Sequence, residues 1–447
     1  MVDCKQKSDN IAVALVKFCT PLILSGILQQ LYNWADAFIV GNYNGEGALA
    51  AVGAVWAINN LYLMVILGFN TGLAILIAQK YGSGEMDEIR KILSTFLAVF
   101  VVLVTVISVL AFVTAKPVLR IMETPEDIFA CSEIYLKIIC IGMPFLAVYN
   151  LYSATLRAIG DSRAPFLAVL VSSVINVILD IILVAVFKWG VAGAAYATII
   201  SQIAMTVFLV VYGIKKHPEI KINIGRGMIH RDCISKSISF GVPPMLQSCI
   251  TSLGNTILQG FMNTFGTATV AAITTAYRVD SIALLPVIYL GSGISTLVAQ
   301  NYGAGDKKRA WKVFTVGTVI MIPVAVILTV LVVLFGGFIV EIFGVGPEAV
   351  DIGARFFRCI GTFYTVFGIS MALRGYVEGM GGVVYSSIFS VTSLGVRLAL
   401  SYILKAYFDN MVIAYAEGIS WVLQMILFAV GIFLIRRKEE NKSAVNL

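Results

Sequence analysis

The chain has 447 residues, of which 59% are hydrophobic and 13% are charged. Soluble globular proteins carry about 25% charged residues, so this composition excludes an ordinary soluble protein and indicates a membrane protein. A helical span needs about 20 apolar residues, and the chain is long enough for many of them. The net charge of +7 comes from short basic segments between apolar runs, which favours membrane topology over nucleic-acid binding.

Apolar stretches occur along the chain in two groups of six. The first group lies at about 14–40, 48–79, 92–115, 128–155, 165–187 and 191–213. After a polar segment, the second group lies at about 239–263, 267–300, 312–335, 349–375, 383–405 and 411–435. This pattern predicts an all-α polytopic membrane protein with twelve transmembrane helices.

The two groups also resemble each other in sequence. The segment Ala78–Gly84 (AQKYGSG) recurs as Ala299–Gly305 (AQNYGAG), 221 residues later, and Pro21 falls beside Pro243 at nearly the same shift. The chain is therefore interpreted as a duplicated six-helix unit, and six crossings return it to its starting side, so the two bundles must be parallel. We predict an N-lobe at 1–213, an inter-lobe linker at 214–237 and a C-lobe at 238–447.

Positive charge predicts the orientation in the membrane. Of the 32 Lys and Arg residues, two lie inside spans and seven lie on one side of the predicted topology. These seven are Lys116, Arg120, Lys137, Lys188, Arg355, Arg358 and Lys405. The others lie on the side that holds both termini, so both termini are predicted to be cytoplasmic. The polar first ten residues are followed by no cleavage pattern, and we expect no cleaved signal peptide.

Cysteine and histidine are too scattered for a metal centre. The seven cysteines form no CxxC pair, and the only histidines are His217 and His230. We therefore expect no structural metal, no disulfide framework and no cofactor.

Four polar residues inside the N-lobe spans are expected at one depth. Asp180 and Thr198 each lie nine residues from the turn that joins the fifth and sixth spans, which places both at roughly 13 Å from it. Asn176 precedes Asp180 by four residues and shares its helix face, while Asp36 lies about nine residues before its own turn. An ionisable residue in a span costs about 2.5 to 3.5 kcal/mol and indicates a functional site.

Two close carboxylates in a low dielectric cannot both stay charged unless they share a cation. Asp36 and Asp180, with Asn176 and Thr198, are therefore candidates for an ion-coupling site that takes up H+ or Na+. The alternative is that neighbouring hydroxyls and amides satisfy Asp36 and Asp180 separately.

The C-lobe differs at the matching positions. Leu258 stands where Asp36 would map, and Arg397 and Ser401 stand where Asn176 and Asp180 would. Glu417 aligns with Thr198 on the neighbouring span. We favour an ion pair between Arg397 and Glu417, with contact to a substrate as the alternative.

Further polar residues are candidates for a substrate cavity between the lobes. Arg278 and Asp280 are two residues apart in one span and so do not share a helix face, and either could instead pair with a neighbouring helix. The other candidates are Gln29, Asn33, Gln247 and Asn255, for which hydrogen bonding between helices is the alternative. Pro21 lies inside the first span and is a candidate hinge, or else a static kink.

Several motifs together resemble the multidrug and toxic compound extrusion (MATE) family over nearly the whole chain. They are Pro21, the run from Gln30 to Asp36 and on to Gly41, Ala78–Gly84, Leu156–Arg163 leading to Pro165, and Ala299–Gly303. The resemblance is to the bacterial DinF-like and NorM-like branches, and it implies a V-shaped, two-lobe antiporter. Such an antiporter expels organic, usually cationic or amphipathic, compounds in exchange for H+ or Na+.

The resemblance also implies roles for individual residues. Asp36, Asn176, Asp180 and Thr198 fall where the DinF-like branch carries its N-lobe cation or proton site. Some NorM-like members carry further acids in the seventh and tenth helices, but this chain has Thr251, Ser252 and Gly368 in those regions, so a C-lobe site of that kind is not expected.

The predicted function is a cation-coupled efflux antiporter of the cytoplasmic membrane. Its partners would be small organic substrates and the lipid bilayer, with no nucleic acid, and the two-lobe design permits a monomer. The rival is a flippase for lipid-linked precursors of the same superfamily, which would prefer a more cationic cavity than Arg278 and Arg397 provide. An intramembrane enzyme is disfavoured because no GxSxG or HExxH motif occurs in a span, and the duplicated lobes fit a transporter better than a channel.

Overall fold

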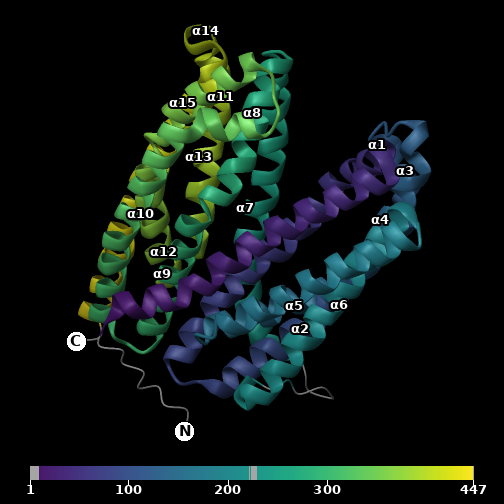
Figure 1. The fold of residues 1–447 in the computed structure, drawn as a ribbon. Coiled ribbons are helices and arrows are strands. Elements are labelled where there is room, and N and C mark those ends of the chain that lie inside the picture. Colours follow the sequence, from purple (N-terminus) through teal and green to yellow (C-terminus); the bar gives the residue numbers. More distant parts are fainter. Residues whose placement is uncertain (1–9, 221, 223–228, 446–447) are drawn as a thin grey trace. The chain divides into compact units, whose positions relative to one another are not determined.

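The computed structural model describes residues 10–220, 222 and 229–445. In this part of the chain the secondary structure is helical, without strands (Figure 1). The first half comprises α1 (Ile11–Gly82), α2 (Met86–Val113), α3 (Ala115–Ile121), α4 (Glu126–Ala158), α5 (Arg163–Asp180), the π-helix η1 (Ile181–Val186), α6 (Gly190–Lys216) and the 3-10 turn η2 (Pro218–Ile220).

The second half has a similar series of long helices. It comprises α7 (Arg231–Asn263), α8 (Thr267–Ala283), α9 (Leu285–Gly303), α10 (Lys307–Ile342), α11 (Pro347–Gly361), α12 (Tyr364–Gly379), α13 (Val383–Ile403), α14 (Lys405–Phe408), η3 (Asp409–Met411) and α15 (Val412–Val445).

The first helical segment, α1, contains two crossings. Its 72 residues would extend about 108 Å as one straight helix, more than three times the bilayer's hydrocarbon core. The backbone leaves helical geometry at Gly45, with φ 79° and ψ −179°. Glycine adopts this conformation without the steric cost that a Cβ would add, so the chain breaks here into two spans.

The expected architecture of twelve crossings is confirmed. Eight helices are long and apolar enough to span a bilayer, and the bent pairs α8–α9 and α11–α12 bring this number to ten. The break at Gly45 makes two spans of α1, and α7, with 33 residues, supplies the remaining crossing. The pair α8–α9 bends by 43° and the pair α11–α12 by 48°, as interrupted membrane helices can when neighbours satisfy the freed backbone groups.

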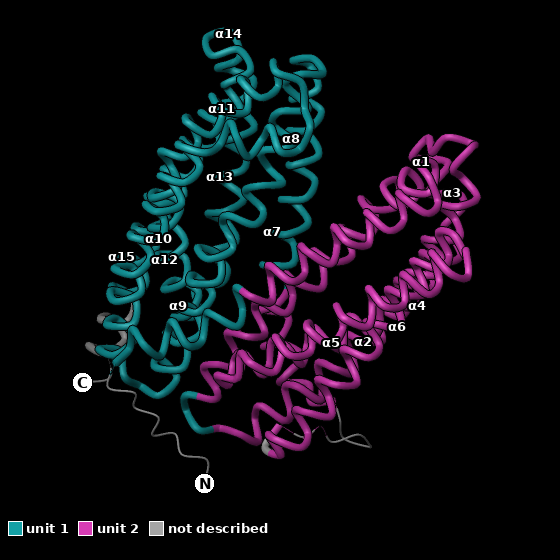
Figure 2. Tube along the Cα trace, viewed as in Figure 1, with its two compact units in different colours: residues 1–23, 82–84, 242–447 teal, residues 24–81, 85–241 magenta. Residues whose placement is uncertain are grey.

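Contacts divide the chain into two compact units (Figure 2). Unit 1 contains residues 1–23, 82–84 and 242–447, and unit 2 contains residues 24–81 and 85–241. The three-part division expected from the repeat remains a prediction. Part of the predicted linker (221 and 223–228) and both chain ends lie outside the described residues.

Unit 1 contains residues from both ends of the sequence. Leu15 and Cys19 on α1 belong to the same buried apolar cluster as Ile294 on α9 and Phe428 on α15. The packing is close, because a Cβ at Gly293 would collide with the Cys19 sulfur. Glycine at this position therefore lets two spans approach closely, as small residues do in membrane helix packing.

Candidate functional site

The strongest candidate site lies inside unit 2 and joins α1 to α5. Asp36 on α1 and Asp180, the last residue of α5, have carboxyl groups within hydrogen-bonding reach of each other. The two acids are 144 positions apart in the sequence, and the packing of the spans brings them together. This is the juxtaposition that their equal depth suggested.

The acid pair has no basic partner in the described residues. No Lys, Arg or His there forms an ion pair with either acid, and neither oxygen of the fully buried Asp180 accepts a hydrogen bond from an N–H or O–H donor. The amide of Asn176, which is 1% exposed, likewise has no hydrogen-bond partner. Two carboxylates this close in a low dielectric repel each other unless a proton or a cation lies with them, so the pair is a candidate site for H+ or Na+.

Two tyrosines lie beside the acid pair, and the sequence did not single them out. Tyr32 lies one helical turn before Asp36 on α1, while Tyr135 comes from α4. Tyr32 and Tyr135 interact electrostatically with both acids. The spacing of four residues between Tyr32 and Asp36 is the one signal that could have revealed one of these tyrosines.

Local backbone geometry also sets Asp180 apart. The residue ends α5, and the next six residues, Ile181–Val186, form a π-helix. Such π-segments are rare and frequently occur at functional sites, because the extra residue per turn shifts the register of the helix. The apolar sequence of Ile181–Val186 does not predict a π-helix.

Thr198 contributes less directly than expected. Its hydroxyl donates a hydrogen bond to the carbonyl of Ala194 on its own helix, at 3.0 Å, and its carbonyl accepts one from Ser201. Its hydroxyl oxygen still has a lone pair to offer a cation. No group of three His, Cys, Asp or Glu side chains in the described ranges could hold a metal ion, so Na+ would need amide, hydroxyl or carbonyl oxygens beside the two acids.

In unit 1, the predicted partners Arg397 and Glu417 lie together. Arg397 Nη2 on α13 is 2.8 Å from Glu417 Oε2 on α15, and both side chains are nearly buried. The hydroxyl of Tyr277 on α8 accepts a hydrogen bond from Arg397 at 2.9 Å and donates one to Glu417 at 3.1 Å. This acid is therefore neutralised and hydrogen-bonded, unlike the pair in unit 2.

Arg278 and Asp280 occupy different faces of α8. Asp280 is buried and accepts a hydrogen bond from the Tyr364 hydroxyl on α12. Arg278 is exposed and lines a pocket of about 610 Å³ on the other side of the helix. The pairing of Asp280 with a neighbouring helix was one of the two alternatives open for this residue.

The remaining candidates are spread over both units. Gln29 and Asn33 belong to unit 2, and Gln247 and Asn255 to unit 1. Gln247 is buried and its amide oxygen has no hydrogen-bond donor. Pro21 lies within the helical part of α1, two residues before the boundary between the units. The roles of these residues in a cavity or a hinge remain predictions.

Outside the spans, Asp161 links three parts of unit 2. It lies in the turn between α4 and α5, where its carboxylate accepts hydrogen bonds from the Tyr212 hydroxyl at 3.2 Å and from the backbone N–H of Ala164 at 3.1 Å. His217 Nε2 lies 3.1 Å away. Partial burial by itself raises the pKa of Asp161, but the hydrogen bonds from His217 and Ala164 and the charge of Lys216 hold it below its ordinary value.

Comparison with known proteins identifies the family. The MatE family model matches residues 21–182 and again residues 243–403, which agrees with the internal duplication. The chain is 28% identical over 443 residues to the "Probable multidrug resistance protein YoeA" of Bacillus subtilis, covering 97% of this chain and 95% of that protein. It is 25% identical over 414 residues to the "Probable multidrug resistance protein NorM" of Thermotoga maritima, covering 91% and 88%.

Solved structures show the same fold. The outward-facing conformation of a multidrug resistance MATE family transporter of the MOP superfamily matches with a TM-score of 0.90 at 20% identity, over 96% of this chain and 97% of that one. A MOP superfamily transporter from Pyrococcus furiosus matches with a TM-score of 0.88 at 21% identity, over 96% of both chains. With two matches to the family model and a shared fold over nearly its full length, this chain belongs to the MatE family of multi-pass membrane transporters.

Proposed function

We propose that this transporter exports structurally diverse organic compounds in exchange for H+ or Na+, with Asp36 and Asp180 as the coupling site. The multidrug-resistance names of its relatives support the export of such compounds. One observation carries the coupling: two buried acids lie within hydrogen-bonding reach of each other with no basic partner among the described residues. Ionisable residues inside a span cost free energy and typically belong to proton or ion pathways. A function in binding and releasing a cation would explain why this pair is present.

The acid pair would couple transport by having two stable states. In the loaded state a proton or Na+ lies between Asp36 and Asp180 and removes their mutual repulsion. In the unloaded state the carboxylates repel each other, which favours a shift of α1 relative to α5. Each positive charge that enters the cell gains about 2.3 kcal/mol per 100 mV of membrane potential, and this free energy would drive substrate outward.

We further propose that the protein works in the cytoplasmic membrane as a monomer, with both termini in the cytoplasm. The distribution of Lys and Arg supports this orientation. The hinge at Pro21 would lie where α1 passes from unit 1 to unit 2, so that the loading of Asp36 could be transmitted along one helix.

The test is export of a fluorescent organic cation from proteoliposomes under separate imposed proton and sodium gradients. The variants are Asp36→Asn and Asp180→Asn, which keep the shape of each side chain and remove its charge. We expect one gradient to drive export by the wild type and each variant to fall to the rate seen without a gradient. Asp127→Asn is the matched control, because Asp127 is an exposed acid of the same unit and its loss should leave export unchanged.

Two results would contradict the proposal. Gradient-driven export that persists in both variants would exclude the acid pair as the coupling site. Wild-type export against a substrate gradient that continues after both ion gradients are collapsed would exclude antiport altogether. The same vesicles can then be used to test flipping of a lipid-linked precursor, the rival reading from the sequence.

A further inference from the structure

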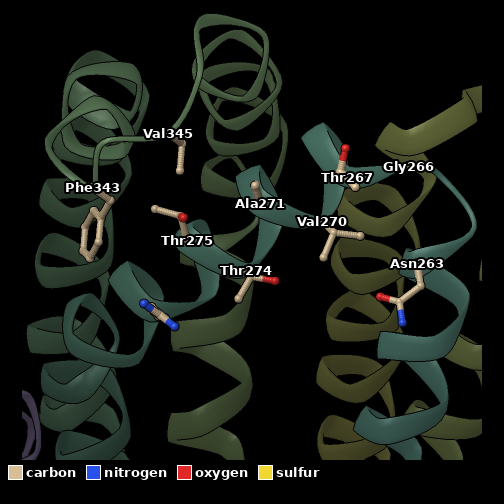
Figure 3. A pocket seen from close by; sticks show the side chains of 10 residues that line it. Asn263, Gly266, Thr267, Val270, Ala271, Thr274, Thr275, Phe343 and Val345 are labelled. Atoms are coloured by element: carbon tan, nitrogen blue, oxygen red, sulfur yellow. The ribbon is translucent and has the colours of Figure 1, made fainter. Parts of the chain in front are cut away.

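One face of α8 in unit 1 is not used by the proposed coupling. Val270, Ala271, Thr274 and Arg278 follow one another at helical spacing and so share this face, while Asp280 points into the core. The face lines the pocket of about 610 Å³, which Phe343 and Val345, in the loop between α10 and α11, also line. Figure 3 shows Ala271, Thr274 and Thr275 lying between Phe343 on one side and Asn263 on the other.

The composition of this pocket is that of a ligand site. Pockets that bind small molecules have volumes of about 300–1,000 Å³ and are mostly apolar, with a few polar groups that fix the ligand. Here the apolar wall is formed by Val270, Ala271, Phe343 and Val345, and none of the lining residues is acidic. Arg278 is the lining residue that carries a charge, so the pocket would attract an anion.

The depth of Arg278 makes this charge notable. It lies eleven residues after Thr267, the first residue of α8, or about 16 Å along the helix. This distance places Arg278 inside the span that α8 and α9 form, and not at its end. Charged residues at such depth face a cavity or a partner, and no carboxylate in the described parts of the chain forms an ion pair with this guanidinium.

A second polar group in the pocket has no partner. The hydroxyl oxygen of Thr274 is inaccessible to solvent and makes no hydrogen bond within the protein. A buried hydroxyl without a partner costs about 1–3 kcal/mol. Thr274 precedes Arg278 by four residues, so both lie on the pocket face of α8.

From these observations, we propose that this pocket binds an amphiphilic organic anion. A phosphate or carboxylate head would pair with Arg278, whose planar guanidinium can donate two parallel hydrogen bonds to such a group. The apolar body would lie on Val270, Ala271, Phe343 and Val345. The anion would be either an anionic membrane lipid or a water-soluble amphiphile, and this proposal does not depend on coupling by Asp36 and Asp180.

The first test measures equilibrium binding of octyl phosphate to the purified full-length protein in a neutral detergent. Arg278→Gln should weaken binding at least about tenfold, since it removes a charged hydrogen-bond donor, and Arg278→Lys should restore part of the affinity. Octyl trimethylammonium, with the same chain and a cationic head, should bind the wild type no better than it binds Arg278→Gln. Arg355→Gln is the matched control, because Arg355 is half-exposed and pairs with Asp351 outside the pocket.

A second variant keeps the test informative if Arg278→Gln misfolds. Ala271→Trp would fill the pocket while leaving the guanidinium in place, so it should also abolish octyl phosphate binding. Equal affinity of the wild type, Arg278→Gln and Ala271→Trp for octyl phosphate would overturn the proposal. Equal binding of the cationic and anionic probes would overturn it as well.

Native mass spectrometry distinguishes the two sources of the anion. Delipidated protein is mixed with dioleoyl phosphatidic acid or dioleoyl phosphatidylcholine. Selective retention of phosphatidic acid by the wild type, lost in Arg278→Gln, identifies a lipid site. Binding of octyl phosphate without retention of phosphatidic acid identifies a site for soluble anions. These measurements need no ion gradient, so a failure here is distinguishable from a failure of the coupling mechanism.

Discussion

The two units differ in whether a basic residue lies beside an acid pair or acid inside the spans. In unit 2, Asp36 and Asp180 lie beside each other with no basic partner in the described part of the unit. In unit 1, the acid Glu417 lies 2.8 Å from Arg397 and also accepts a hydrogen bond from Tyr277. The repeat aligns Arg397 with Asn176 and Glu417 with Thr198, whereas Leu258 and Ser401 stand where Asp36 and Asp180 would.

The difference separates an acid that an arginine compensates from an acid pair that no basic residue in the described part of unit 2 compensates. A guanidinium is always protonated in proteins. The guanidinium of Arg397 therefore balances the negative charge of Glu417 without a bound ion. The acid pair of unit 2 has no such group among the described residues, and this is the reason we propose H+ or Na+ as its partner. The two halves of the duplication thus differ at several matching positions, since unit 1 has Leu258, Arg397 and Ser401 where unit 2 has Asp36, Asn176 and Asp180.

The largest stability effect is expected from breaking the compensated pair. Glu417→Gln leaves Arg397 buried without its counter-charge, which typically costs about 3–5 kcal/mol. Asp180→Asn removes an uncompensated acid and should leave the thermal unfolding temperature unchanged or raised. Unfolding of both variants in the same detergent measures the contrast, and equal losses in the two would show that the units do not differ in this way.

Removal of both members of the pair should restore most of that loss. When a buried ion pair is replaced by apolar or neutral groups of similar size, the result is often near neutral. We expect Arg397→Met combined with Glu417→Gln to unfold within about 1–2 kcal/mol of the wild type. A double variant as unstable as Glu417→Gln alone would mean that the hydrogen bonds of Tyr277 matter more than the charge.

A smaller effect is expected at Asp280, the other buried acid of unit 1. Tyr364→Phe removes the hydroxyl that donates to Asp280 and should cost about 1–3 kcal/mol of stability, since a buried acceptor loses its donor. Tyr407→Phe is the control, because Tyr407 is 79% exposed. If the two tyrosine variants unfold at the same temperature, the hydrogen bond contributes nothing measurable.

The smallest effect is expected at Asp161, and it should depend on pH. Its pKa lies below the ordinary value, so the charged carboxylate stabilises the folded state above the ordinary pKa of about 3.9. This contribution is lost as the pH falls through the lower pKa of the folded protein. Asp161→Asn should therefore cost about 1 kcal/mol at neutral pH.

The cost of Asp161→Asn should shrink below pH 3.9. Unfolding temperatures of the wild type and Asp161→Asn, compared across this pH range, give the measurement. A constant difference between them would show that the charge of Asp161 is not involved. Lys116→Gln, which removes an exposed charge from α3, controls for general effects of charge at low pH.

Much of this organisation follows from local sequence. Apolar runs of about 20 residues can be stable only as membrane helices, so the crossings and the duplication are readable without a structure. The gap between the apolar stretches 14–40 and 48–79 also predicted a break between the first two spans. Equal distances from the turns placed Asp36 and Asp180 at one depth, because the rise per residue of a helix is constant.

Other features depend on contacts between distant segments. Tyr135 beside the acid pair comes from α4, an ordinary apolar run forms the π-helix after Asp180, and the first turns of α1 belong to unit 1. Depth can be counted along a chain, but the direction in which a side chain points depends on how helices rotate and pack against each other. The sequence by itself therefore determined the number of spans and the level of the acids. Only the tertiary structure decided which side chains meet, with Asp280 turned to Tyr364 and Arg278 turned to a pocket, since helix packing selects the neighbours of each face.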